Sequence, residues 1–245
     1  MKPNIDIEII TACIPDIYAR FTDWFKSVLN ASDGTLNLAL SGGNTPKALF
    51  EYWTANHQDD IDWTRVRFFW SDERCVPPND EQSNYRMTKE YLFDRLPVSE
   101  GQIFRIEGEN EPFAEAKRYA EVLRRELKAQ NEIPSFDIVM LGMGDDGHTA
   151  SIFPHQIALW DSPEICVVGT HPQSGQQRVS LSGKTINAAK NIAFLVTGKS
   201  KAERVREIIE TRGQAERRYP AAKAAAQSGN LLWFLDNDAA ALLNP

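Results

Sequence analysis

The sequence predicts an α/β protein built on a mostly parallel sheet that helices cover on both faces. Short apolar runs, rich in β-branched residues, alternate along the chain with longer segments whose apolar residues recur at helical spacing. Several of these runs end in loops of glycine and polar residues, which in a wound sheet border the ligand crevice. The length of 245 residues and the 42% hydrophobic content suit one domain over residues 1–245.

Strands are expected at short apolar runs bounded by turn-forming residues. The clearest is Phe136–Leu141, which ends at a glycine. Ile103–Ile106 is a shorter and weaker run. The other predicted strands, in chain order, are Ile5–Ile10, Thr35–Leu40, Val66–Trp70, Ile165–Gly169, Arg178–Leu181, Asn191–Thr197 and Leu231–Leu235.

Helices are expected where apolar residues recur with the period of one helical face. The first, Pro15–Ala31, has an apolar face that we expect in the core, formed by Ile17, Phe21, Trp24, Phe25 and Val28. Pro46 suits the first turn of a helix that continues over Lys47–Trp53. The later predicted helices are Asn84–Asp94, Pro112–Gln130, a segment from Lys201 through Glu210, a short alanine-rich segment from Tyr219, and a C-terminal segment after Leu235.

Composition limits the partners and the compartment. The net charge of −7 speaks against a nucleic acid or an anionic membrane as a partner. The three cysteines, Cys13, Cys75 and Cys166, are scattered without a CxxC pair, which is typical of reduced thiols in the cytosol. The N-terminus has no apolar signal region, and no stretch reaches the roughly 20 apolar residues of a membrane span. We expect a cytoplasmic protein that is a monomer or a weak homo-oligomer.

Four polar loops each come directly after a predicted strand. They are Ser41–Thr45, Asp72–Arg74, Gly142–His148 and Gly198–Lys201. Because the carboxyl ends of parallel strands lie along the same edge of a sheet, we expect these loops to meet there.

His148 is the first candidate for a catalytic group. A glycine-rich turn delivers it past a buried strand, and histidine is the side chain whose unperturbed pKa lies nearest neutral pH. Thr149–Ser151 is a plausible helix start. Gly142, Gly144 and Gly147 formally spell the dinucleotide pattern GxGxxG. However, Asp145 and Asp146 would set negative charge against a pyrophosphate, so a nicotinamide enzyme is not indicated.

The loop SGGNTP (residues 41–46) has the features of a phosphate cradle. Gly42 and Gly43 let backbone N–H groups approach an anion, Ser41, Asn44 and Thr45 add polar side chains, and a predicted helix follows. An ordinary glycine turn with Thr45 as the helix N-cap explains the pattern equally well.

Other motifs narrow the chemistry. The chain has no GxSxG nucleophile elbow, and its four histidines show no metal-ligand spacing, which leaves a general-base site without a covalent nucleophile or a metal. Asp72-Glu73-Arg74 is either functional or a surface ion-pair group. Arg178, Lys199 and Lys201 are cations on loops of the expected site, although each alone is more typical of a solvated side chain.

Taken together, these stretches resemble the 6-phosphogluconolactonase family, a branch of the group that includes glucosamine-6-phosphate deaminases. The matching segments are LALSGGNTP, FFWSDERCVPPNDEQSNY, FDIVMLGMGDDGHTASIFP, RVSLSGKTINAAKNIAFLVTGKSKA and YPAAKAAAQSGNLLWFLDNDAA. They run in the family's order over nearly the whole chain. The resemblance implies a Rossmann-like three-layer α/β/α fold of the sugar-phosphate isomerase type.

The resemblance also implies a reaction, the hydrolysis of the δ-lactone of 6-phosphogluconate in the oxidative pentose phosphate pathway, without a cofactor. The SGGNTP loop, Arg178 and Lys201 would hold the sugar phosphate. Asp72 and Arg74 would line the sugar cleft, and His148 would be the base. Asp145 or Asp146 would orient its ring, and glycine-loop N–H groups or Arg74 would stabilise the oxyanion.

Two alternatives to lactone hydrolysis stay open. The deaminase branch typically continues as GHIAFNEP, with a glutamate that assists ring opening, whereas the chain has GHTASIFP without an acid there. This difference favours the lactonase over a glucosamine-6-phosphate deaminase-like isomerase. A non-catalytic sugar-phosphate sensor is the other alternative, and the acidic chain without an additional N-terminal domain speaks against it.

Overall fold

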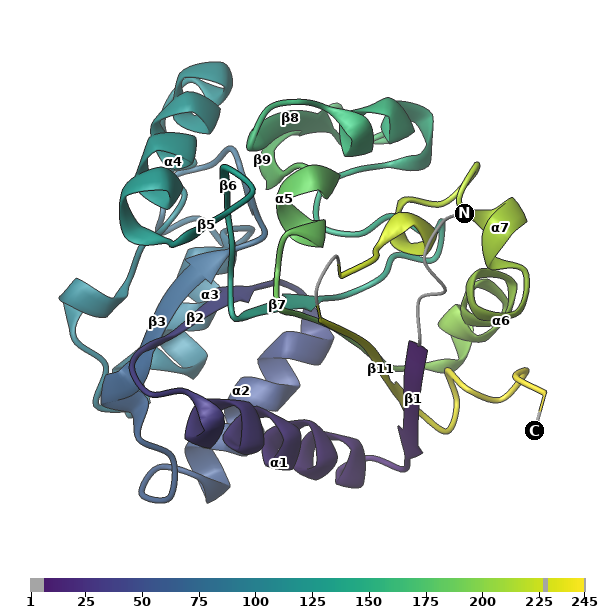
Figure 1. Cartoon of the computed structure of the whole chain (residues 1–245), viewed down its shortest axis with the longest axis horizontal. Helices are drawn as coiled ribbons and strands as arrows, with labels where there is room; N and C mark the ends of the chain where they lie inside the picture. The colour runs from purple at the N-terminus through teal and green to yellow at the C-terminus, as the bar shows by residue number, and fades with distance from the viewer. Residues whose placement is uncertain (1–6, 227–228, 245) are drawn as a thin grey trace.

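A central sheet organises the computed structural model, which describes residues 7–226 and 229–244 (Figure 1). Within these residues, six strands pair in the order β1-β11-β10-β7-β2-β3, and every neighbouring pair is parallel. The strands are β1 (Ile7–Ala12), β2 (Leu36–Leu40), β3 (Val66–Trp70), β7 (Ile138–Leu141), β10 (Asn191–Val196) and β11 (Asn230–Asp236). The expected parallel sheet is confirmed. Ile5, the predicted start of the first strand, lies outside the described residues.

Helices and smaller elements cover this sheet. Figure 1 shows α1 (Asp16–Ala31) and α2 (Asn44–Asn56) on one side of the sheet, and α5 (Gly183–Asn187) with β8 (Cys166–Thr170) and β9 (Gln177–Leu181) on the other. Helix α4 (Pro112–Glu126) packs on β8 and β9. The remaining α-helices that the structure describes are α3 (Asn84–Tyr91), α6 (Ala202–Glu210) and α7 (Arg212–Ala215). The three-layer α/β architecture is therefore the one expected.

A second, antiparallel sheet differs from the prediction. Asp72–Arg74, expected as a loop, forms strand β4, and the order of this sheet is β4-β9-β8. The Leu181 N–H donates to the Ser71 carbonyl at 2.8 Å, so pairing with β9 continues directly past the end of β3. Three charged residues show no strand pattern by themselves, because the partner that pairs with them lies about a hundred residues away in the sequence.

Several predicted elements end early or take another form. Helix α3 stops at Tyr91 and α4 at Glu126, and the residues after α4 form a small hairpin, β5 (Ala129–Gln130) with β6 (Ile133–Pro134). Ile103 makes only an isolated bridge to Phe68. The segment expected as a helix from Tyr219 is one 3₁₀ turn, η6 (Pro220–Lys223), and residues 237–242 form turns instead of a C-terminal helix. Each of these segments is too short for helical periodicity to decide its form.

The apolar face of α1 lies in the core, as predicted. Ile17, Phe21 and Phe25 are fully buried, and Trp24 and Val28 are partly buried against the same cluster. This connected core runs from Ile17 to Ala239. The core suits the expected single domain, which stays a prediction. No helix among the described residues is both long and apolar enough to cross a bilayer.

We predict that Phe21→Ala costs about 3–5 kcal/mol of unfolding free energy. The Phe21 ring is fully buried and lies 4.9 Å from the Phe234 ring and 6.2 Å from the Trp53 ring, so truncation leaves a cavity that rigid neighbours do not fill. Urea denaturation followed by circular dichroism measures the loss. Ile14→Ala is the control, because Ile14 is 53% exposed. A loss below about 1 kcal/mol for Phe21→Ala would contradict this account of the core.

Candidate functional site

A cavity of about 400 Å³ lies at the carboxyl ends of β2, β3, β7 and β10. Each of the four predicted loops contributes to its wall, so the expected convergence is confirmed. The predicted site residues that line it are Ser41, Gly42, Gly43, Asn44, Thr45, Asp72, Arg74, His148, Arg178 and Lys201. Asp146 does not line the cavity but contacts the His148 ring from behind.

The SGGNTP loop leads directly into the N-terminus of α2. Gly43 is the N-cap and has a φ of 104°, a conformation that favours glycine. A Cβ atom on Gly42 would lie 1.8 Å from Asn84 Oδ1, so this backbone packs closely on that side chain. The first N–H groups of the 13-residue helix have no intrahelical partner, which makes this end of the cavity favourable for an anion.

Two hydroxyls of this loop have structural partners. Ser41 is buried, and its hydroxyl donates to the Met140 carbonyl at 2.8 Å. The Thr45 hydroxyl lies 2.8 Å from the Thr197 hydroxyl, which ties α2 to the end of β10. Thr45 is therefore not the N-cap that an ordinary turn would have used.

The histidine loop folds back on itself. The Gly147 N–H donates to the Gly144 carbonyl, and the Gly144 N–H donates to the His148 carbonyl, both at 2.9 Å. Gly147 has a φ of 81°, and a Cβ on Gly144 would lie 2.2 Å from the His148 ring. The predicted helix start at Thr149–Ser151 is wrong, because these residues continue the turn through a bridge between Thr149 and Ile152.

The two neighbouring acids of this loop have different partners. Asp146 Oδ1 lies 2.6 Å from His148 Nδ1 and also accepts from the His148 backbone N–H at 3.1 Å. Asp145 Oδ1 instead lies 2.6 Å from Lys201 Nζ. Asp146 is thus the acid that orients the ring. When the imidazole is neutral, an Nδ1–H that donates to Asp146 leaves Nε2 unprotonated.

The contact also shifts the titration of Asp146. Burial by itself would raise the pKa of this carboxyl, but the hydrogen bond from His148 and the charge of the ring outweigh it and lower the pKa to about 2. The Lys201 ammonium lowers the pKa of Asp145 in the same way. Both acids are therefore carboxylates at neutral pH.

Arg74 and Arg178 are directly opposite each other across β4 and β9. Like charges in that position repel unless an anion lies between them or solvent screens them. The Nε atom of each is buried without a hydrogen-bond partner, and within the described residues neither arginine has a carboxylate within 4.0 Å. Burial lowers the pKa of Arg178, and the nearby charge of Asp72 opposes that shift. Arg74 Nη1 donates to the Gln82 carbonyl at 2.6 Å, and two guanidinium groups this close favour an anion between them.

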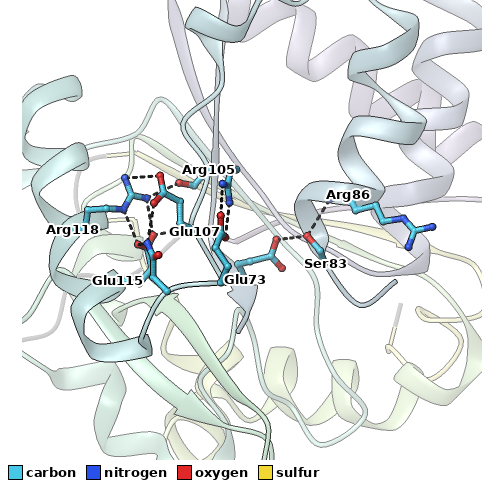
Figure 2. A network of polar contacts seen from close by, with 9 residues as sticks. Glu73, Ser83, Arg86, Arg105, Glu107, Glu115 and Arg118 are labelled. Atoms are coloured by element: carbon cyan, nitrogen blue, oxygen red, sulfur yellow. Dashed lines mark hydrogen bonds and ion pairs between the residues drawn. The ribbon is translucent and has the colours of Figure 1, made fainter. Parts of the chain in front are cut away.

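Strand alternation separates the three charged residues of β4. Asp72 and Arg74 face the cavity, and the Ser151 hydroxyl donates to Asp72 Oδ2 at 2.5 Å. Glu73 is buried and faces away. Figure 2 shows it at the Ser83 end of α3, where it also accepts the Asn84 N–H at 2.7 Å. Glu73 is thus an anchor for α3, neither a site residue nor a surface ion pair.

Part of the cavity wall is formed by residues that the sequence did not predict for the site. Asn84 lines it, is 2% exposed, and donates from Nδ2 to the Asp72 carbonyl at 2.9 Å, next to Gly42. Thr149 and Thr197 line it too. No local pattern marks Asn84 because it reaches the cavity only through the packing of α3. Lys199, a cation on one of the predicted loops, is not among the residues that line the cavity. Among the residues described, no group of three or more His, Cys, Asp or Glu gathers as a metal site requires.

Comparisons with known proteins show which sequences and structures the chain is similar to. A model of the family described as glucosamine-6-phosphate isomerases/6-phosphogluconolactonase matches residues 11–233. A 6-phosphogluconolactonase of Treponema pallidum is 48% identical over 187 residues, 76% of this chain and 77% of its own. One of Haemophilus influenzae is 44% identical over 209 residues, 85% of this chain and 88% of its own. The crystal structure of a devB protein superposes with a TM-score of 0.89 at 41% identity, covering 96% of this chain and 99% of that one.

We predict that Asp146 titrates with a midpoint near 2 in the wild type and at a higher pH in His148→Ala, where burial still raises the pKa and only the backbone N–H bonds are left to lower it. Carboxyl carbon shifts in NMR measure both midpoints. Because the folded-state pKa is depressed, the carboxylate stabilises the fold above about pH 4, and this contribution is lost as the pH falls toward 2. An unchanged midpoint in His148→Ala would contradict the contact. Asp161, paired with Lys223, is the control carboxyl.

Proposed function

The chain belongs to the family of glucosamine-6-phosphate isomerases and 6-phosphogluconolactonases, and we propose that it is a 6-phosphogluconolactonase. It hydrolyses 6-phospho-D-glucono-1,5-lactone to 6-phospho-D-gluconate, the lactone-opening step of the oxidative pentose phosphate pathway. The observation that carries the proposal is one cavity with a histidine held at Nδ1 by an acid on one wall and an anion site on the other.

The anion site matches the phosphate of such a substrate. The N-terminus of α2 supplies backbone N–H groups, and Arg178 and Lys201 supply positive charge on the same cavity. A phosphate bound there takes no part in the reaction. It holds the lactone carbonyl at a fixed distance from the catalytic histidine.

His148 is the general base. Its Nε2 removes a proton from water, and the hydroxide adds to C1 of the lactone. The tetrahedral intermediate then collapses with cleavage of the bond between C1 and the ring oxygen, which takes the proton from the imidazolium. Asp146 keeps the ring in the required tautomer and stabilises its charged form at 2.6 Å.

The negative charge that develops on the carbonyl oxygen needs donors. Arg74 lines the cavity with a buried Nε that has no partner among the described residues, and Gly42 and Gly43 line the same cavity. Asp72, fixed by Ser151, lines the sugar-binding part of the cavity and can accept hydrogen bonds from sugar hydroxyls. No cofactor or metal is needed, because a lactone carbonyl is already electrophilic.

The lactonase is distinguished from its alternatives by turnover. We expect freshly prepared 6-phosphogluconolactone to be hydrolysed faster than in an enzyme-free control, which is essential because the lactone also opens spontaneously. Glucosamine 6-phosphate should release no ammonia, since the run GHTASIFP has Phe153 at the position where the deaminase run GHIAFNEP has its glutamate. Ammonia release would support the deaminase, and binding of either compound without turnover would support a sensor.

His148→Ala should lower kcat by about 10²–10⁴ with a modest change in KM, because a base acts only in the transition state. Arg178→Ala should chiefly raise KM, because phosphate binding is equal in the ground and transition states. Steady-state kinetics of both variants measures the difference. Unimpaired turnover by His148→Ala would remove histidine from the base role.

A further inference from the structure

We propose that Asp145 sets the affinity of the phosphate site by competing with the substrate for Lys201. The inference rests on the proposed function, because it assigns the phosphate to the wall that Lys201 lines. In the free protein Asp145 neutralises Lys201, and a phosphate that binds there must share this cation with the carboxylate.

The exposure of the two side chains indicates that Lys201 can be shared with a ligand and is not locked in a buried ion pair with Asp145. Lys201 Nζ lies 2.6 Å from Asp145 Oδ1, and the Lys201 side chain is 22% exposed whereas that of Asp145 is 68% exposed. Lys201 lines the cavity and Asp145 does not. The ammonium therefore faces both the cavity and a carboxylate that lies in solvent beyond it.

Asp145 is held in this place by the turn before α6 and by the first turn of that helix. The Ser200 hydroxyl donates to Asp145 Oδ1 at 3.1 Å, and Arg204 Nε donates to the Asp145 carbonyl at 3.3 Å. The carboxylate is thus fixed beside Lys201 even when the ammonium turns toward a ligand. It remains a negative charge next to the bound phosphate.

The other two cations of the cavity differ from Lys201 in having no carboxylate partner among the described residues. Arg74 and Arg178 have no carboxylate within 4.0 Å in the part of the chain that the structure describes, whereas Lys201 has Asp145. Among Arg74, Arg178 and Lys201, only Lys201 is paired with a carboxylate of the described residues. Asp145 therefore weakens the anion site without entering it.

The effect should fall on binding and not on the chemical step. The phosphate does not change charge during lactone opening, so repulsion from Asp145 is equal in the ground and transition states. The product carries the same phosphate, and the repulsion therefore also favours its release. For a charge several ångströms away in a solvated position, we expect an effect of about two- to fivefold on the dissociation constant.

Asp145→Asn tests the charge while keeping an oxygen that can accept from Lys201. The matched control is Asp161→Asn, because Asp161 and Lys223 form a pair with the same 2.6 Å distance and exposures of 68% and 21%. Binding of 6-phosphogluconate is measured by calorimetry at low and high salt. We expect Asp145→Asn to bind about two- to fivefold more tightly at low salt, a gain that screening removes at 0.5 M salt, and Asp161→Asn to match the wild type.

Two other results would overturn the inference. If Asp145 only orients Lys201, Asp145→Asn will match the wild type and Asp145→Ala will bind more weakly. An equal gain in Asp161→Asn would show that net charge alone is responsible. A wild-type protein that binds no 6-phosphogluconate would instead remove the proposed function, and the inference with it, so the two failures are distinguishable.

Discussion

Parallel pairing in the central sheet places the carboxyl ends of β2, β3, β7 and β10 along one edge, and the cavity is built from the segments that begin there. In a parallel sheet, the loops that follow neighbouring strands all lie at the same edge of the sheet. Residues separated by more than a hundred positions, such as Thr45 and Thr197, therefore come within 2.8 Å. Loss of this register would separate the SGGNTP loop from His148 while leaving each loop locally intact.

The histidine loop gives two adjacent acids opposite tasks. Asp146 turns back to the His148 ring, and Asp145 turns toward Lys201 on another wall. The tight turn closed by Gly144 and Gly147 makes this possible, since neither position has room for a side chain. One short loop thus orients the His148 ring and sets a carboxylate beside Lys201.

The small antiparallel sheet places charged side chains at the cavity that the parallel sheet does not carry. Its pairing of β4 with β9 sets Arg74 opposite Arg178, and strand alternation directs Asp72 into the cavity while Glu73 anchors α3. Through α3, Asn84 packs on Gly42 and bonds to the Asp72 carbonyl. The two walls of the cavity are thereby held at a fixed separation by buried hydrogen bonds.

The sequence by itself determined the strands of the parallel sheet, most of the helices beside it and three of the four loops that line the cavity. These follow from the periodicity of apolar residues and from glycines at strand ends, which are local properties. Only the tertiary structure decided that Asp146 and not Asp145 orients His148, that Asp72–Arg74 is a strand, and that Asn84 belongs to the cavity. The physical reason is that partners distant in sequence settle these points: Lys201 draws Asp145 away, β9 pairs with β4, and the packing of α3 brings Asn84 to Gly42.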